Sequence, residues 1–149
     1  MTFSASRFVS DATTTLTTNA DGSSSLSLTP SNYTVDAAAG AVRMSGNGTK
    51  GGRYRALPGS LSVKGNSIAL DNALFELPGG TLNLAAMGDL SVHNSQLLAK
   101  GGLLNFPVTI GTSTYNNTFT LDGGQINLSS TNGTVAIDQN SILDTSASL

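Results

Sequence analysis

Glycine pairs recur at a fixed interval in the second half of this 149-residue sequence. The pairs begin at Gly79, Gly101 and Gly123, so that successive pairs are 22 residues apart. The first and third pairs open stretches in which apolar and polar residues alternate, which is the period of a β-strand. A repeat of roughly twenty residues is typical of solenoids, in which successive turns of the chain stack on one another. The spacing therefore predicts a stack of similar coils.

Three lines of sequence, 59–78, 79–100 and 123–146, can be superposed, and each contains three alternating segments. The aliphatic residues that coincide are Leu61, Leu82 and Ile126, then Val63, Leu84 and Leu128, in the first segment; Ile68, Leu90 and Val135, then Leu70, Val92 and Ile137, in the second; and Leu74, Leu97 and Ile142 in the third. Between the first two segments lie Gly65-Asn66, Met87-Gly88 and Asn132-Gly133, which predict corners where glycine supplies a positive φ. The sequence thus predicts an all-β protein, a right-handed parallel β-helix of about 20–22 residues per coil.

Residues 101–122 keep the 22-residue spacing of the glycine pairs but lack the aliphatic alternation of the other lines. Phe106, Tyr115 and Phe119 are bulkier than the aliphatic residues of the other lines, and Pro107 cannot donate to a central ladder. We expect a loop or hairpin outside the coils, laid over their flank so that its aromatic rings cover apolar surface. A fourth, irregular coil is the alternative.

Residues 1–58 are less regular, and we expect early irregular coils or flanking strands there. Their alternating runs are interrupted at Asp21-Gly22, which predicts a hairpin or a corner. Lys50, Arg53 and Arg55 lie in a glycine-punctuated stretch that predicts a solvated loop, with a ligand-binding basic patch as the alternative. The regular coils, with the excursion at 101–122, are expected over 59–149.

Composition agrees with strands and turns and excludes several classes of function. Only 11% of the residues are charged, and Ser, Thr, Asn and Gly supply most of the polar surface. A net charge of −2 and a pI near 5.0 give no basis for nucleic-acid binding. The lack of cysteine excludes disulfides, thiolate metal sites and a cysteine nucleophile. No apolar run is long enough for a membrane-spanning helix, and MTFSASRF lacks the features of a signal peptide, so a secreted protein would carry its signal upstream.

The strongest enzymatic alternative is a β-helix polysaccharide lyase or hydrolase, which needs clustered carboxylates beside an arginine or lysine. The carboxylates of the coils are instead spread along the chain: Asp71, Glu76, Asp89, Asp122, Asp138 and Asp144. Asp71 and His93 fall on adjacent coils near one corner and form the most suggestive acid–imidazole pair, although His93 is expected to point outward as a surface turn residue. No nucleophile elbow or phosphate loop accompanies them. We therefore predict no enzymatic activity and nominate no catalytic, cofactor-binding or metal-ligating residue.

Asn72 and Asn94 occupy matching corners, with Gln139 or Asn140 near the third. Inward-turned asparagines stacked along a solenoid can satisfy corner backbone groups and neighbouring amides. Solvent-exposed turn residues are the alternative.

The coil lines resemble the filamentous-haemagglutinin family of exoproteins. The resemblance rests on GSLSVKGNSIALDNALFELPGGTLNLAA, GDLSVHNSQLLAKGG and DGGQINLSSTNGTVAIDQNSILDTSAS, and with YTVDAAAGAV it covers about residues 35–148. It implies an internal fragment of a β-helical shaft, exported by two-partner secretion through an outer-membrane transporter to the bacterial surface. The implied roles are adhesion, biofilm formation or cell contact, with host or bacterial surface glycans or proteins as partners.

A polysaccharide-binding or polysaccharide-degrading β-helix is the alternative function. Open coil ends are unpaired strand edges, so end-to-end self-association is also expected.

Overall fold

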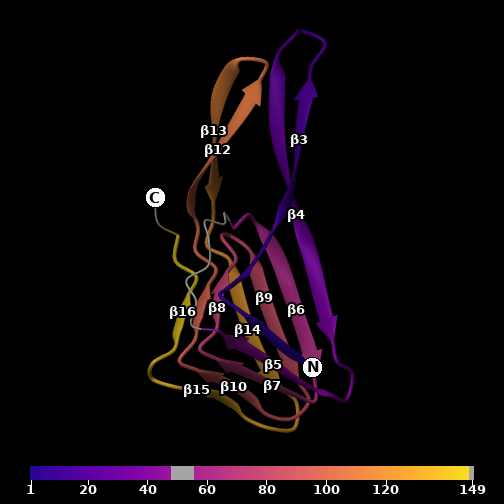
Figure 1. Cartoon of the computed structure of the whole chain (residues 1–149), viewed down its shortest axis with the longest axis vertical. Coiled ribbons are helices and arrows are strands. Elements are labelled where there is room, and N and C mark those ends of the chain that lie inside the picture. The colour runs from indigo at the N-terminus through magenta and orange to yellow at the C-terminus, as the bar shows by residue number, and fades with distance from the viewer. Residues whose placement is uncertain (48–55, 148–149) are drawn as a thin grey trace.

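The computed structural model describes residues 1–47 and 56–147. All regular secondary structure in these residues is β-strand. The all-β prediction is therefore confirmed. Seen along the shortest axis of the molecule, the strands form three walls around a common interior, and two hairpins project beyond the walls (Figure 1). Over the described ranges, no helix is present that could cross a membrane.

Each wall is one sheet, and the described strands pass through the three sheets in a recurring order that is broken once, between residues 46 and 59, where no strand of the third sheet is described. The first sheet has the order β14 (Gln125–Ser130), β9 (Thr81–Ala86), β6 (Gly59–Gly65), β4 (Ser24–Asp36) and β3 (Ala12–Thr18). The second has the order β1 (Thr2–Ala5), β5 (Ala41–Gly46), β7 (Ser67–Asp71), β10 (Leu90–His93) and β15 (Val135–Ile137). The third has the order β16 (Ile142–Asp144), β11 (Gln96–Leu98), β8 (Leu74–Glu76) and β2 (Phe8–Val9).

Antiparallel pairing interrupts this arrangement at two places. Every pair within the three sheets is parallel except β3–β4, and β12 (Gly102–Ile110) forms a separate antiparallel hairpin with β13 (Ser113–Leu121). The chain therefore combines parallel and antiparallel strands, whereas the sequence predicted a parallel β-helix carrying one or two extra-helical elements.

The predicted alignments of the first two segments are confirmed by the strand registers. Leu61 pairs with Leu82, which pairs with Ile126 on its other side. In the second sheet, Leu90 likewise lies between Ile68 and Val135. Inward aliphatic side chains from successive strands therefore lie on top of one another.

Burial within these columns depends on having a neighbour on both sides. Ile68 and Leu90 are 1% and 0% exposed, whereas Val135, on the last strand of the same sheet, is 41% exposed. Val92 is 1% exposed, and its outer neighbour Ile137 is 46% exposed. The core is thus continuous through the middle of the stack and open at the β15 end.

The predicted alignment of the third segment is wrong by one residue. Leu97 pairs with Phe75 and Leu143, not with Leu74 and Ile142. Phe75 is fully buried, and Ile142 is 49% exposed on the outward side. Because two apolar residues are adjacent in each of these short strands, alternation alone does not distinguish the inward one from the outward one.

The corner asparagines would have fixed this register. Asn72 and Asn94 both adopt a positive φ, 51° and 44°, and the inward residues Phe75 and Leu97 follow them at the same spacing. Asparagine tolerates this left-handed conformation better than most residues.

The predicted positive φ at the corner glycines Gly65, Gly88 and Gly133 is wrong. Positive φ values occur at Gly22, Gly79, Gly102 and Gly111, and none of these is a corner between the first two segments. The repeated glycine pairs are required by close packing instead. A Cβ on Gly124 would lie 1.9 Å from the carbonyl oxygen of Gly80, and a Cβ on Gly80 would lie 2.1 Å from that of Gly59.

The excursion at 101–122 is a hairpin, so the irregular-coil alternative is wrong. It does not lie over the flank of the sheets: it projects from the body beside the β3–β4 hairpin (Figure 1). Phe106 and Phe119 are half-buried, and Tyr115 is 57% exposed. Pro107 is accommodated because both strands of a two-stranded hairpin have a free edge. The hairpin expected as one possibility at Asp21-Gly22 is confirmed as the turn between β3 and β4.

Candidate functional site

The structure brings together the one acid–imidazole pair that the sequence had singled out. Asp71 ends β7 and His93 ends β10, and the two residues are direct neighbours across the parallel pair. Their side chains meet with 3.0 Å between His93 Nδ1 and Asp71 Oδ1. The predicted outward orientation is confirmed, because the His93 side chain is 65% exposed.

Two further charged groups extend this pair into a ladder across the second sheet. Asp138 follows β15 and places Oδ2 3.5 Å from His93 Nε2. On the opposite side, the Arg43 guanidinium lies 3.3 Å from Asp71 Oδ2. The Ser141 hydroxyl, which donates to Asp138, lowers the pKa of that carboxyl, and the Asn94 N–H and the charge of His93 add to this effect. The order along the stack is therefore Arg43, Asp71, His93 and Asp138.

This ladder consists of contacts between side chains of neighbouring strands. Both ring nitrogens of His93 face carboxylates, so that neither is directed at a hydroxyl that could act as a nucleophile. The described residues contain no cluster of three potential ligands able to hold a metal ion. Arg43 and His93 are exposed and the two carboxylates are half-buried, and ion pairs at such positions stabilise only weakly.

Uncharged polar side chains form further contacts of this kind, at the corner after the second sheet and on the outward side of the first sheet. Asn94 Nδ2 donates to Asn72 Oδ1 at 2.5 Å, and Asn127 Nδ2 donates to Asn83 Oδ1 at 2.7 Å. The inward orientation predicted for the corner asparagines is wrong, because Asn72 and Asn94 are exposed, as the alternative held; their amides are nevertheless stacked. The outward surface is therefore polar, repetitive and largely neutral.

A buried serine that the sequence analysis missed holds the neighbouring corner. Ser95 is fully buried; its Oγ accepts the Ala73 N–H at 3.0 Å and donates to the His93 carbonyl at 2.8 Å. Ser141 repeats the arrangement one strand further on, where its Oγ accepts the Ser95 N–H at 3.2 Å. The signal in the sequence was a small residue directly after each corner asparagine.

The comparisons with known proteins add no relative. No family model, curated protein or solved structure matches this chain.

The second candidate site is a cleft between the two projecting hairpins. It has a volume of about 370 Å³ and is lined by uncharged residues from both hairpins: Leu16, Gly22, Ser24, Leu26, Val108, Ile110, Tyr115 and Asn117. The sequence analysis did not find it, because its two sides are distant in the sequence and no motif marks either. The basic patch considered at Lys50, Arg53 and Arg55 lies outside the described residues.

Proposed function

We propose that this chain is a segment of a right-handed parallel β-helix that acts as a non-enzymatic structural shaft in a large secreted bacterial surface protein. In this role it displays its outward faces for adhesion, biofilm formation or cell contact. An outer-membrane transporter would export the protein, and host or bacterial surface glycans or proteins would be its ligands.

The observation that carries this proposal is the repeated parallel register of the three sheets. Leu61 and Leu82 pair in the first sheet, Ile68 and Leu90 in the second, each at nearly the same sequence separation. Neighbouring parallel strands of one sheet are joined through strands of the other sheets, and a coil is the simplest path that does this. Crossovers between parallel strands of one sheet are predominantly right-handed. A coil of this kind needs neighbours to bury its columns, and this property suits a long stacked shaft.

The composition of the outward surface supports the proposed display of ligand-binding faces. Outward positions of the first sheet carry amides and hydroxyls, such as Asn83 and Asn127, which can bond to a ligand without selecting its charge. The resemblance of the coil lines to filamentous-haemagglutinin-family exoproteins supports a bacterial surface location.

Antibody labelling of intact cells tests the location. An antibody raised against this chain should label unpermeabilised bacteria, and deletion of the partner transporter should abolish the labelling. Labelling that requires permeabilisation would contradict a surface role.

The alternative is a polysaccharide-degrading β-helix, and the observation in its favour is the contact of His93 with Asp71 and Asp138. We expect no turnover of acidic polysaccharides. Turnover that is abolished by Asp71→Asn or His93→Gln would establish the alternative in place of the structural role.

Exposed apolar side chains on the last strands support end-to-end self-association as a further property of the segment. Ile137 and Leu143 are 46% and 39% exposed at positions where their inner neighbours are buried. Sedimentation of the purified chain over a range of concentrations tests this expectation.

A further inference from the structure

Each projecting hairpin has one apolar face. In the first hairpin, Leu16 and Leu26 are directly opposite one another across β3 and β4 and so lie on the same face. In the second, Val108 is opposite Tyr115, and Ile110 lies two residues further along the same face. The other face of the second hairpin is more polar towards the tip: Thr118 Oγ1 donates to Asn105 Oδ1, and the hydroxyls of Thr109 and Thr114 are 3.1 Å apart.

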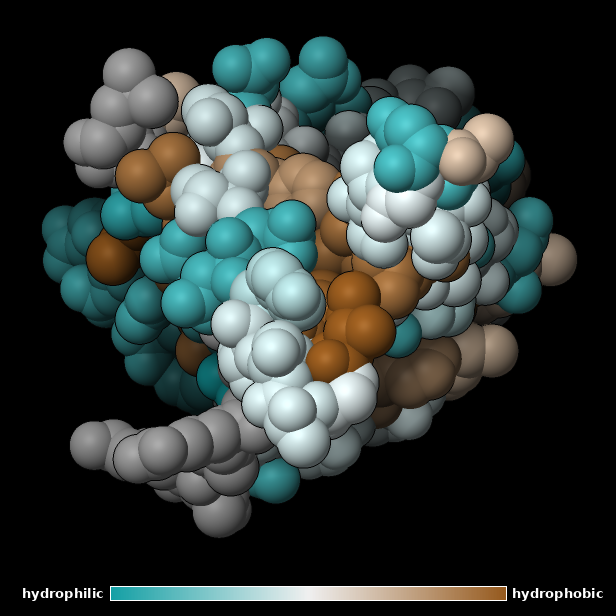
Figure 2. Space-filling view, turned by 90° about the horizontal axis from the view of Figure 1, so that it is seen from above, coloured by the Kyte–Doolittle hydropathy of each residue, from teal (hydrophilic) through white to brown (hydrophobic). Residues whose placement is uncertain are grey.

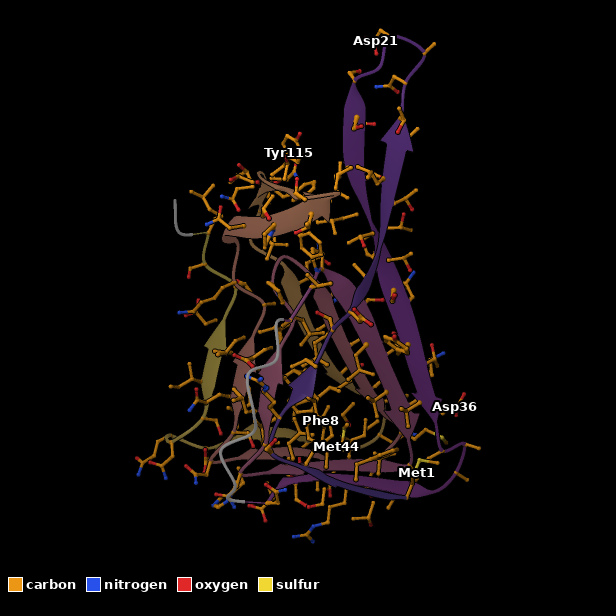
Figure 3. All side chains as sticks on the ribbon, turned by 45° about the horizontal axis from the view of Figure 1, so that its top comes forward. Met1, Phe8, Asp21, Asp36, Met44 and Tyr115 are labelled. Atoms are coloured by element: carbon orange, nitrogen blue, oxygen red, sulfur yellow. The ribbon has the colours of Figure 1, made fainter. Side chains whose placement is uncertain are left out.

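The two apolar faces line the same cleft. Leu16 and Leu26 contribute one side, and Val108, Ile110 and Tyr115 contribute the other. Seen from above, hydrophobic surface lies in the middle of this end of the molecule and is bordered by polar residues (Figure 2). Tyr115 lies on the β12–β13 hairpin and Asp21 marks the tip of the other (Figure 3).

Closure of the cleft is incomplete towards the hairpin tips. Val108 and Leu26 are half-buried, whereas Leu16, Ile110 and Tyr115 are 44%, 42% and 57% exposed. Apolar side chains that remain open in a concave surface of about 370 Å³ have the size and character of a small-ligand site.

The lining indicates the chemistry of the ligand. Ser24, Tyr115 and Asn117 supply hydroxyl and amide groups, and none of the described residues that line the cleft is charged. An anionic or cationic ligand would find no counter-charge among them. A ligand with weakly apolar C–H faces and many neutral hydroxyls would be matched by the aliphatic and aromatic side chains and by these polar groups.

Other ligand classes fit less well. An extended peptide would depend on main-chain hydrogen bonds, and the cleft is lined by the faces of the hairpins rather than by their edges. A fatty acyl chain would leave the hydroxyl and amide groups of Ser24, Tyr115 and Asn117 without partners.

From these observations we infer that the cleft between the β3–β4 and β12–β13 hairpins binds a neutral oligosaccharide. The Tyr115 ring stacks on a sugar face, and Leu16 closes the cleft from the opposite hairpin. This inference rests on the proposed function and deepens it, because it names the class of ligand that a site on the surface segment would bind.

The test is a saturation-transfer NMR titration of the full chain with maltotriose, cellotriose and tri-N-acetylchitotriose. Tri-galacturonate and decanoate serve as the acidic and acyl probes. We expect at least one neutral trisaccharide to bind and the other two probes to show no saturation transfer. Tyr115→Ala and Leu16→Asp should each weaken binding about tenfold or more, since each removes a large apolar side chain that lines the cleft. Tyr115→Phe, which keeps the ring, should weaken it less than Tyr115→Ala.

Tyr33→Ala is the matched control, because Tyr33 is also exposed, at 49%, and lies outside the cleft. It should leave binding unchanged. Far-UV circular dichroism of every variant establishes that the sheets are intact, and Tyr115→Phe keeps the test valid if Leu16→Asp does not fold.

The inference is overturned if no neutral trisaccharide binds, if tri-galacturonate or decanoate binds as well or better, or if Tyr33→Ala weakens binding as much as Tyr115→Ala. These failures are distinguishable from failure of the proposed function. Turnover of a bound trisaccharide would contradict the non-enzymatic role and leave the cleft as a saccharide site. An unliganded cleft would leave the structural role untouched.

Discussion

Truncation of Ile68 to alanine tests the stacked core at its centre. Ile68 is 1% exposed and lies between Val42 and Leu90, its neighbours on the two adjacent strands. Each buried methylene contributes about 0.8 kcal/mol, so the lost transfer free energy alone is about 2.4 kcal/mol. A cavity enclosed by neighbours on both sides adds to this loss, and we expect the free energy of unfolding to fall by about 3–4 kcal/mol.

The same truncation of Ile137 provides the matched comparison. Ile137 also points inward, but it has a neighbouring strand only on the side of Val92 and is 46% exposed. The truncation therefore loses only about half of the transfer free energy, and no closed cavity forms. We expect a loss of about 1 kcal/mol.

Urea unfolding followed by far-UV circular dichroism measures both variants under the same conditions. The wild type and the two variants should share one denaturant slope and differ in their midpoints. Equal losses for Ile68→Ala and Ile137→Ala would refute the reasoning, because they would show that burial does not depend on a neighbouring strand on each side.

Three further predictions concern individual contacts. Gly124→Ala should lower the unfolding midpoint strongly, because its Cβ would meet the carbonyl oxygen of Gly80; Gly88→Ala, whose nearest contact is 3.2 Å, should lower it less. Ser95→Ala should cost about 1–3 kcal/mol in urea unfolding, because it leaves a buried N–H without its acceptor. Lys100 and Ser146 lower the pKa of Asp144 to about 2, so this carboxyl stabilises the fold above pH 4, and its contribution is lost as the pH falls through 2. Acid titration of Lys100→Ala should therefore show a smaller decline in stability between pH 4 and pH 2.

The sequence was sufficient where two signals fixed the same residue. Leu82 and Leu90 were placed correctly because glycines delimit their strands and the alternation within the strands is unambiguous. Leu74 and Phe75 are adjacent apolar residues in a three-residue strand, and alternation does not distinguish them. Phe75 follows Asn72 at the same spacing as Leu97 follows Asn94, and this signal becomes decisive once the positive φ of both asparagines is known.

One of the two candidate sites could be predicted from the sequence, and the other could not. The contact of Asp71 with His93 could be predicted, because both occupy the same position of successive strands in one register. The cleft beside Tyr115 could not, because its shape depends on the directions in which two hairpins leave the body. Alternation in the β12–β13 segment identifies its apolar face, but it does not identify what that face meets.

Disulfide trapping between Asn83 and Asn127 tests the central claim, the stacking of β9 on β14, most directly. The two residues are 44 positions apart and are direct neighbours across the parallel pair. Neighbouring Cα atoms of this kind are about 4.8 Å apart, within the range of a disulfide, and the natural chain has no cysteine to compete. Asn83→Cys combined with Asn127→Cys should form an intramolecular disulfide rapidly and completely in the native state. Asn83→Cys with Ser129→Cys, displaced by two residues to about 8 Å, should remain reduced. Equal oxidation of both pairs, or preferential oxidation of the displaced pair, would contradict the stacked register.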